Sequence, residues 1–167
     1  MAPQPSGTQR TLNNVYLVFF AIHIPVILFV DLVRFYPEGA APSISLTIQD
    51  YYVNNFHDKF FSDEAPSWFT AYLVLEAVYH LPVSAWMLNA LLEDHPQLPL
   101  QLLIFAMQTA LTTFTCLVEM LSWPDYSIEE QLKLCSLYVP YLALAVVMGI
   151  DSSLRLKRII EAKAKAN

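Results

Sequence analysis

Glycine and cysteine are scarce in this sequence, and their scarcity argues against several kinds of site. The chain has only 3 glycines in 167 residues and contains neither a GxGxxG nor a P-loop pattern, so a loop that cradles phosphate is not expected. The 2 cysteines, Cys116 and Cys135, lie in apolar runs and form no CxxC motif. We interpret them as small buried hydrophobes, since a disulfide or a metal site has little support. No cofactor is predicted.

Charge is also scarce. Charged residues make up 14% of the chain and hydrophobic residues 56%, whereas a soluble domain has about 25% charged residues. The hydrophobic residues gather in four runs, at residues 15–33, 68–92, 98–121 and 132–154. A helix that spans a bilayer needs roughly 20 mostly apolar residues. We therefore predict an all-α integral membrane four-helix bundle.

The segments outside these runs predict one further helix. We expect residues 1–14 to be a flexible lead. We interpret the first run as a retained transmembrane helix and not as a cleaved signal peptide, because it is long and polar residues interrupt it. In the longest connection, apolar residues recur near helical spacing over residues 44–61 and predict a short amphipathic helix that lies on the membrane or caps the bundle. His57, Asp58 and Lys59 are interpreted as a solvated patch, without a metal.

Basic residues predict the orientation. Five of the 9 lie in the tail at residues 155–167, and Arg10 lies at the other terminus, so the positive-inside rule places both termini in the cytosol and the amphipathic helix in the lumen. The sequence ends KAKAN, where Lys163 and Lys165 form a KxKxx dilysine pattern, an address for endoplasmic-reticulum membrane proteins. The predicted domains are a cytosolic lead at residues 1–14, a four-helix membrane domain at 15–154 and a basic tail at 155–167.

Two carboxylates within the predicted spans carry the functional hypothesis. Glu76 lies on the order of 13 Å below the interface, and Asp31 lies near the lumenal end of the first helix. An ionisable group inside a bilayer costs roughly 2.5–3.5 kcal/mol and is functional by default. We expect the two acids to share one proton, which leaves one negative charge for a ligand with a single cation and a large apolar body.

Other polar groups are predicted at similar depth. Tyr141 and Thr115 are level with Glu76, and His23 and His80 lie on the faces of the two acids. In a purely structural alternative, the side chains of Glu76 and His80 form hydrogen bonds with each other or with helix backbone. The hydroxyl-rich stripe around Thr112 is equally consistent with hydrogen bonds between helices.

Three segments carry a family resemblance: HIPVILFVDL at 23–32, APSWFTAYLVLEAVYHLP at 65–82 and LKLCSLYVPYL at 132–142. They resemble the sigma-2 receptor family of EXPERA-domain proteins. The resemblance implies an endoplasmic-reticulum protein, often a homodimer, that binds sterols and cationic amphiphiles and no nucleic acid. It implies that Asp31 and Glu76 form the amine site and that Tyr138, Tyr141 and Thr112 line the pocket.

The wider EXPERA group includes a sterol Δ8-Δ7 isomerase, so an enzyme is the alternative. Isomerisation needs one group to donate a proton and another to remove one, and Asp31 and Glu76 could divide these tasks. The isomerase pattern has a histidine one turn before its glutamate, whereas here Tyr72 occupies that position and His80 follows Glu76. This departure favours a binding protein. A third hypothesis, suggested by fungal members, is help in delivering mitochondrial precursors.

Overall fold

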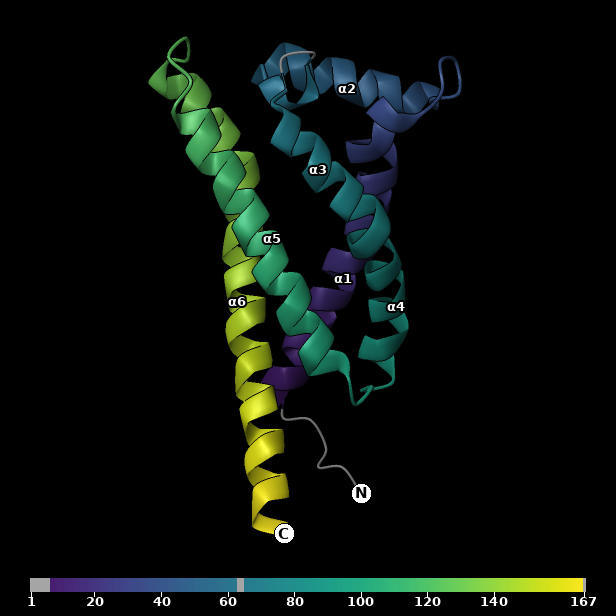
Figure 1. Ribbon diagram of the computed structural model, residues 1–167, viewed down its shortest axis with the longest axis vertical. Coiled ribbons are helices and arrows are strands. Elements are labelled where there is room, and N and C mark those ends of the chain that lie inside the picture. The colour runs from purple at the N-terminus through teal and green to yellow at the C-terminus, as the bar shows by residue number, and fades with distance from the viewer. Residues whose placement is uncertain (1–6, 63–64, 167) are drawn as a thin grey trace. The chain divides into compact units, whose positions relative to one another are not determined.

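The computed structural model describes residues 7–62 and 65–166, and the described residues form helices and short connections with no strand among them (Figure 1). Four helical segments are long and apolar enough to cross a membrane: Gly7–Phe35, Ser67–Leu92, Leu98–Leu121 and Ile128–Lys165. The predicted all-α membrane class is thereby confirmed. The chain divides into two compact units, which we describe separately: unit 1 comprises residues 1–51 and 65–95, and unit 2 comprises residues 52–64 and 96–167.

Unit 1 is built on two antiparallel helical segments that pack along each other. Helix α1 and α4 are in contact, and their buried side chains include Tyr16, Phe20 and Ile27 from α1 and Met87 from α4. The elements of this unit are α1 (Gly7–Phe29), η1 (Asp31–Phe35), most of α2 (Ser43–Phe56), α3 (Ser67–Leu75), η3 (Glu76–His80) and α4 (Leu81–Leu92).

Helix α1 begins at Gly7, well before the expected start at Val15. The prediction of a flexible lead is therefore wrong for residues 7–14, and residues 1–6 lie outside the described residues. Asn13 is buried, and its Nδ2 donates a hydrogen bond of 3.2 Å to Oδ1 of Asp94, which follows α4. This contact ties the first turns of α1 to the end of α4 and explains why a polar sequence remains helical.

A π-helical turn interrupts the second spanning segment at η3. The backbone N–H of Leu81 donates to the carbonyl of Glu76, five residues earlier. In an α-helix the acceptor would be the carbonyl four residues earlier. Pro82 follows at once, and a proline ring inside an α-helix clashes with the carbonyl four residues before it. We attribute the wide turn to Pro82. Glu76 and His80 consequently lie at the two ends of the π turn.

Unit 2 is a helical hairpin of α5 (Leu98–Leu121) and α6 (Ile128–Ala166). It also includes the short turn η2 (Lys59–Phe61), which lies between α2 and α3 in the chain. The two long helices pack along each other (Figure 1). A Cβ atom added to Gly149 would lie 3.7 Å from the Cβ atom of Ala106, so small residues allow a close approach here. Leu102, Phe105 and Leu134 are fully buried.

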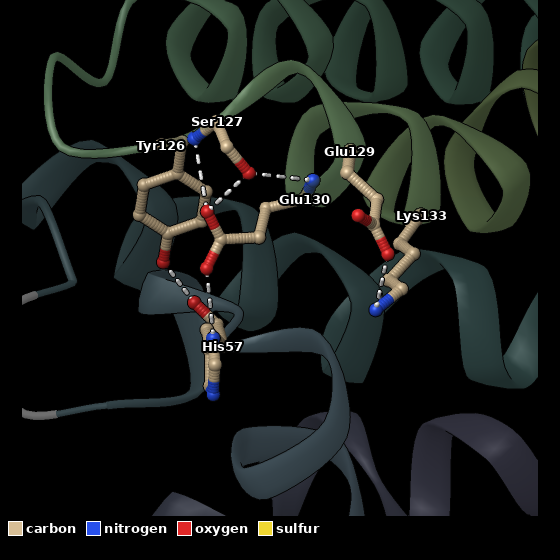
Figure 2. A network of polar contacts seen from close by, with 6 residues as sticks. All are labelled: His57, Tyr126, Ser127, Glu129, Glu130 and Lys133. Carbon is tan, nitrogen blue, oxygen red and sulfur yellow. Dashed lines mark hydrogen bonds and ion pairs between the residues drawn. The ribbon is translucent and has the colours of Figure 1, made fainter.

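Helix α6 extends beyond the predicted run at both ends. It starts at Ile128 because Ser127 and Glu130 form a capping box: the N–H of Ser127 donates to Oε2 of Glu130 over 2.9 Å, and the N–H of Glu130 donates to Oγ of Ser127 over 3.3 Å (Figure 2). It continues through Pro140 to Ala166, so the basic tail is helical as far as that residue.

The connection between α2 and α3 differs from the prediction in two ways. The expected helix at 44–61 ends at Phe56, and a separate 3₁₀ turn, η2, follows. The interpretation of residues 57–59 as a solvated patch is wrong for Asp58, which is fully buried. Its carboxylate accepts hydrogen bonds from the Tyr138 hydroxyl over 2.7 Å and from the N–H of Phe60 over 3.0 Å, and these donors replace water.

Candidate ligand-binding site

The two predicted membrane acids lie together in unit 1. Asp31 opens η1, where α1 gives way to a 3₁₀ turn, and Glu76 opens η3 at the start of the π turn. Both side chains are half-buried, and the charge of Asp31 acts on Glu76. The Oε2 atom of Glu76 is buried and has no hydrogen-bond partner among the described residues. One carboxyl oxygen is therefore left for a further partner.

His23 and His80 meet within the same unit, one on α1 and one on η3. Their side chains are almost completely buried, and the ring centroids lie 5.9 Å apart in an edge-on arrangement. The His23 ring also stacks on Phe19, with centroids 5.2 Å apart. The histidine from α1 and the histidine from η3 thus form one buried imidazole pair, which offers donors and acceptors without requiring a charge.

Two hydroxyl groups of the same unit were not predicted from the sequence. The Tyr79 hydroxyl, within η3, and the Ser84 hydroxyl, in α4, are both buried and make no hydrogen bond with another described residue. Ser84 is four residues past His80, so helical spacing places both on one face. That spacing was a usable signal, but a single buried serine in an apolar run is easily read as a packing residue.

This arrangement is suited to binding a cation or moving a proton. Two carboxyl groups between membrane helices cannot both ionise cheaply, and a cationic partner removes that cost. Among residues 7–62 and 65–166, no group of three histidine, cysteine, aspartate or glutamate side chains is placed to hold a metal ion. The chemistry available in unit 1 is therefore that of carboxyl, imidazole and hydroxyl groups.

The other predicted pocket residues belong to unit 2. The hydroxyl of Thr112 donates to two carbonyls of its own helix, those of Gln108 and Thr109, over 3.1 and 3.2 Å. Tyr138 donates to Asp58, and Tyr141 is half-buried. These three residues belong to a different compact unit from the two acids, so a role for them beside the acids stays a prediction.

The predicted address residues lie near the end of α6. The Lys163 and Lys165 side chains are exposed in its last turn, and the final residue of the motif, Asn167, lies outside the described residues. Both lysine side chains are thus accessible to solvent.

Comparison with known proteins identifies a family and two named relatives of this chain. Residues 44–152 match the family model EXPERA (EXPanded EBP superfamily). Efficient mitochondria targeting-associated protein 19 of Schizosaccharomyces pombe is 28% identical over 151 residues, which cover 89% of this chain and 79% of that protein. Human Sigma intracellular receptor 2 is 26% identical over 157 residues, which cover 86% of this chain and 88% of the receptor.

Proposed function

The chain belongs to the EXPERA superfamily, and on this basis we propose that it binds sterols and cationic amphiphilic small molecules within the endoplasmic-reticulum membrane. The observation that carries the proposal is the pairing of Asp31 with Glu76, whose Oε2 atom is buried without a hydrogen-bond partner among the described residues. A ligand ammonium between the two carboxyl groups supplies that partner.

The charge balance favours a ligand with a single cation. When the two acids share one proton, the pair carries one negative charge, and one ammonium group neutralises it inside the low-dielectric membrane. The apolar side chains of α1 and α4 favour a large hydrocarbon body, since few charged groups lie in these segments. The imidazole pair of His23 and His80 can provide hydrogen bonds for a polar group on the same ligand.

The remaining parts of the proposal concern location and assembly. The basic residues support cytosolic termini, and the KxKxx pattern supports residence in the endoplasmic reticulum. The match to a relative that is named a receptor supports ligand binding. Homodimer formation rests on the family resemblance alone.

The direct test is ligand binding by the purified full-length chain in nanodiscs, with a radiolabelled tertiary-amine amphiphile and with cholesterol as a neutral probe. Asp31→Asn should weaken amine binding at least about thirtyfold, below detection at the probe concentrations used, and leave cholesterol binding largely intact. Glu119→Gln, which changes a carboxylate in α5 outside the pair, serves as the matched control and should bind both probes normally. Full-strength amine binding by Asp31→Asn would place the charge partner elsewhere.

A second candidate function is help in delivering mitochondrial precursors. The match over most of the chain to a Schizosaccharomyces pombe protein named for mitochondria targeting favours it. Cells that lack this chain distinguish the candidates. Accumulation of mitochondrial precursors at the endoplasmic reticulum supports the delivery role, and accumulation of a Δ8 sterol supports an isomerase. Loss of amine binding without either change supports the binding protein.

A further inference from the structure

A short segment of unit 2 is fastened to the turn between α5 and α6. We call residues 57–61 the latch. The Tyr126 hydroxyl donates to the backbone carbonyl of His57, and Nδ1 of His57 lies 3.3 Å from Oε1 of Glu130 (Figure 2). Nζ of Lys59 lies 2.9 Å from Oδ2 of Asp125. Backbone and side chains of the latch are therefore both held by the turn and the first residues of α6.

Aromatic contacts reinforce the latch. The Lys59 ammonium lies 5.5 Å from the ring centroid of Trp123 and 5.2 Å from that of Tyr126, within the range of cation–π attraction. The Phe60 side chain is 1% exposed and packs against Trp123 with ring centroids 5.1 Å apart. These contacts do not depend on a group that titrates near neutrality, so they set a basal strength for the latch.

Asp58 is the titratable group of the latch whose ionised form is disfavoured by burial. Its side chain is fully buried, and Tyr138 and the N–H of Phe60 donate to its two oxygens. Burial raises the pKa of Asp58 to about 6, although both hydrogen bonds act in the opposite direction. At neutral pH the closed latch therefore holds a buried carboxylate, and at pH 5 it holds a neutral carboxyl group.

We propose that the latch is a proton-sensitive clasp, which tightens on acidification and loosens as the pH rises to neutrality. His57 also lies beside an acid, since its Nδ1 atom is 3.3 Å from Oε1 of Glu130. The other titratable groups around the latch are Tyr52 from α2, Lys59 from η2, Cys116 from α5, Asp125 and Tyr126 from the turn, and Glu130 and Tyr138 from α6.

The direction follows from proton binding. In the closed latch the pKa of Asp58 is about 6, above its ordinary value of 3.8, so the closed state binds more protons than the open state between these values. The closed state is consequently favoured below pH 4, and this preference declines as the pH rises through 6. Between pH 5 and pH 7 the opening equilibrium should increase about tenfold.

The latch lies between α2 and α3 in the chain, and α3 leads directly into Glu76. Opening the latch frees residues 57–61, which belong to the segment that joins α2 to α3, from the turn between α5 and α6. In the topology of the proposed function this connection is lumenal, so the clasp responds to lumenal pH. Only this last assignment rests on the proposed function; the opening equilibrium can be measured whether or not the chain binds amines.

Hydrogen exchange of the Phe60 and Phe61 amides tests the proposal. The full-length protein in nanodiscs is measured at pH 5, 6 and 7, and each rate is corrected for the intrinsic pH dependence of exchange. The protection factors of the wild type should fall about tenfold from pH 5 to pH 7. In Asp58→Asn they should be almost independent of pH. Asp125→Asn is the matched control: it removes the negative charge of the ion pair with Lys59, lowers protection at every pH and keeps the slope.

Tyr138→Phe provides a second, independent measurement. It keeps the ring and removes the hydroxyl that donates to Asp58, a hydrogen bond that lowers the pKa of this acid. The midpoint of the protection change should therefore move to higher pH, even if Asp58→Asn fails to fold. Wild-type protection that is equal at pH 5 and pH 7, an Asp58→Asn slope equal to that of the wild type, or an unmoved midpoint in Tyr138→Phe would each overturn the proposal.

Discussion

At the scale of single residues, the two carboxyl groups of unit 1 have different surroundings and should respond differently to substitution. Asp31 lies where α1 ends, and Glu76 lies inside a continuous helical segment with one oxygen buried. A carboxyl group near the end of a membrane span is closer to water, so its ionisation costs less free energy than that of a deeper group. For the proposed binding of a cationic ligand, we therefore expect Asp31 to be its charged partner and Glu76 to be the protonated, positioning group.

This assignment predicts graded effects on amine binding. Asp31→Asn should weaken binding by about 2–5 kcal/mol, at least thirtyfold, because a desolvated charge partner is lost. Glu76→Gln keeps a donor of similar shape and should weaken binding less than Glu76→Ala, which leaves a void. His80→Ala should weaken it less than alanine at either acid. Equilibrium binding to purified variants measures the series, and monodisperse elution controls for folding. Equal affinities for Glu76→Gln and Glu76→Ala would contradict the positioning role.

Asp58 shows where prediction from local sequence ends. His57, Asp58 and Lys59 are consecutive polar residues in a long connection, and such a run is normally solvated. Asp58 is buried because Tyr138, 80 residues later, donates to its carboxylate. A contact over that separation leaves no periodic signal in the chain. The pair of Asp31 and Glu76, by contrast, could be anticipated because charged residues within apolar runs stand out.

At the scale of the helices, hydropathy predicted the elements better than their ends. The third helix was predicted at 98–121, and α5 has these bounds. The starts of α1 and α6 were missed because a side-chain contact at Asn13 and a capping box at Ser127 extend both helices into polar sequence. The π turn at η3 was also missed, since one wide turn barely alters the hydrophobic period. Pro82 was its only signal.

The capping box predicts a local effect. Ser127→Ala removes the hydroxyl that accepts from the N–H of Glu130 and should destabilise the first turn of α6 by about 1 kcal/mol. Hydrogen exchange of the amides at residues 128–131 should accelerate about fivefold. Ser136→Ala is the matched control, because the Ser136 hydroxyl donates to a carbonyl of its own helix, that of Lys133. Unchanged exchange in Ser127→Ala would mean that packing alone holds this helix start.

At the scale of the whole molecule, the lengths of the helices limit how the chain crosses a membrane. Helix α6 has 39 residues and α5 has 24, which correspond to about 58 Å and about 36 Å. The hydrocarbon core is about 30 Å thick, so α6 is long enough to extend far beyond it. Five of the 9 basic residues lie at the C-terminal end of α6, from Arg155 onward, and Arg155 is held by Asp151 over 2.7 Å.

Four spans and a basic extension predict the orientation in microsomes. Protease added to sealed vesicles should remove a tag placed after Asn167 and spare a tag inserted at Gly39. Gly39 suits the insertion, because its neighbourhood is open and its φ of +75° marks a turn. Detergent-treated vesicles, in which both tags should be cleaved, provide the control. Cleavage at Gly39 with protection of the tail would reverse the topology.

If the tail is cytosolic, Lys163 and Lys165 could retain the protein either as a recognised KxKxx signal or only through their positive charge. Lys163→Ser combined with Lys165→Ser removes both lysines of the KxKxx pattern, whose side chains are exposed, and should let an N-terminally tagged protein leave the endoplasmic reticulum. Lys157→Ser combined with Arg158→Ser removes the same charge and keeps the pattern, so this variant should stay. Imaging compares the two. If both leave, the tail acts through its charge; if neither leaves, the lysines are not an address and another feature of the protein retains it.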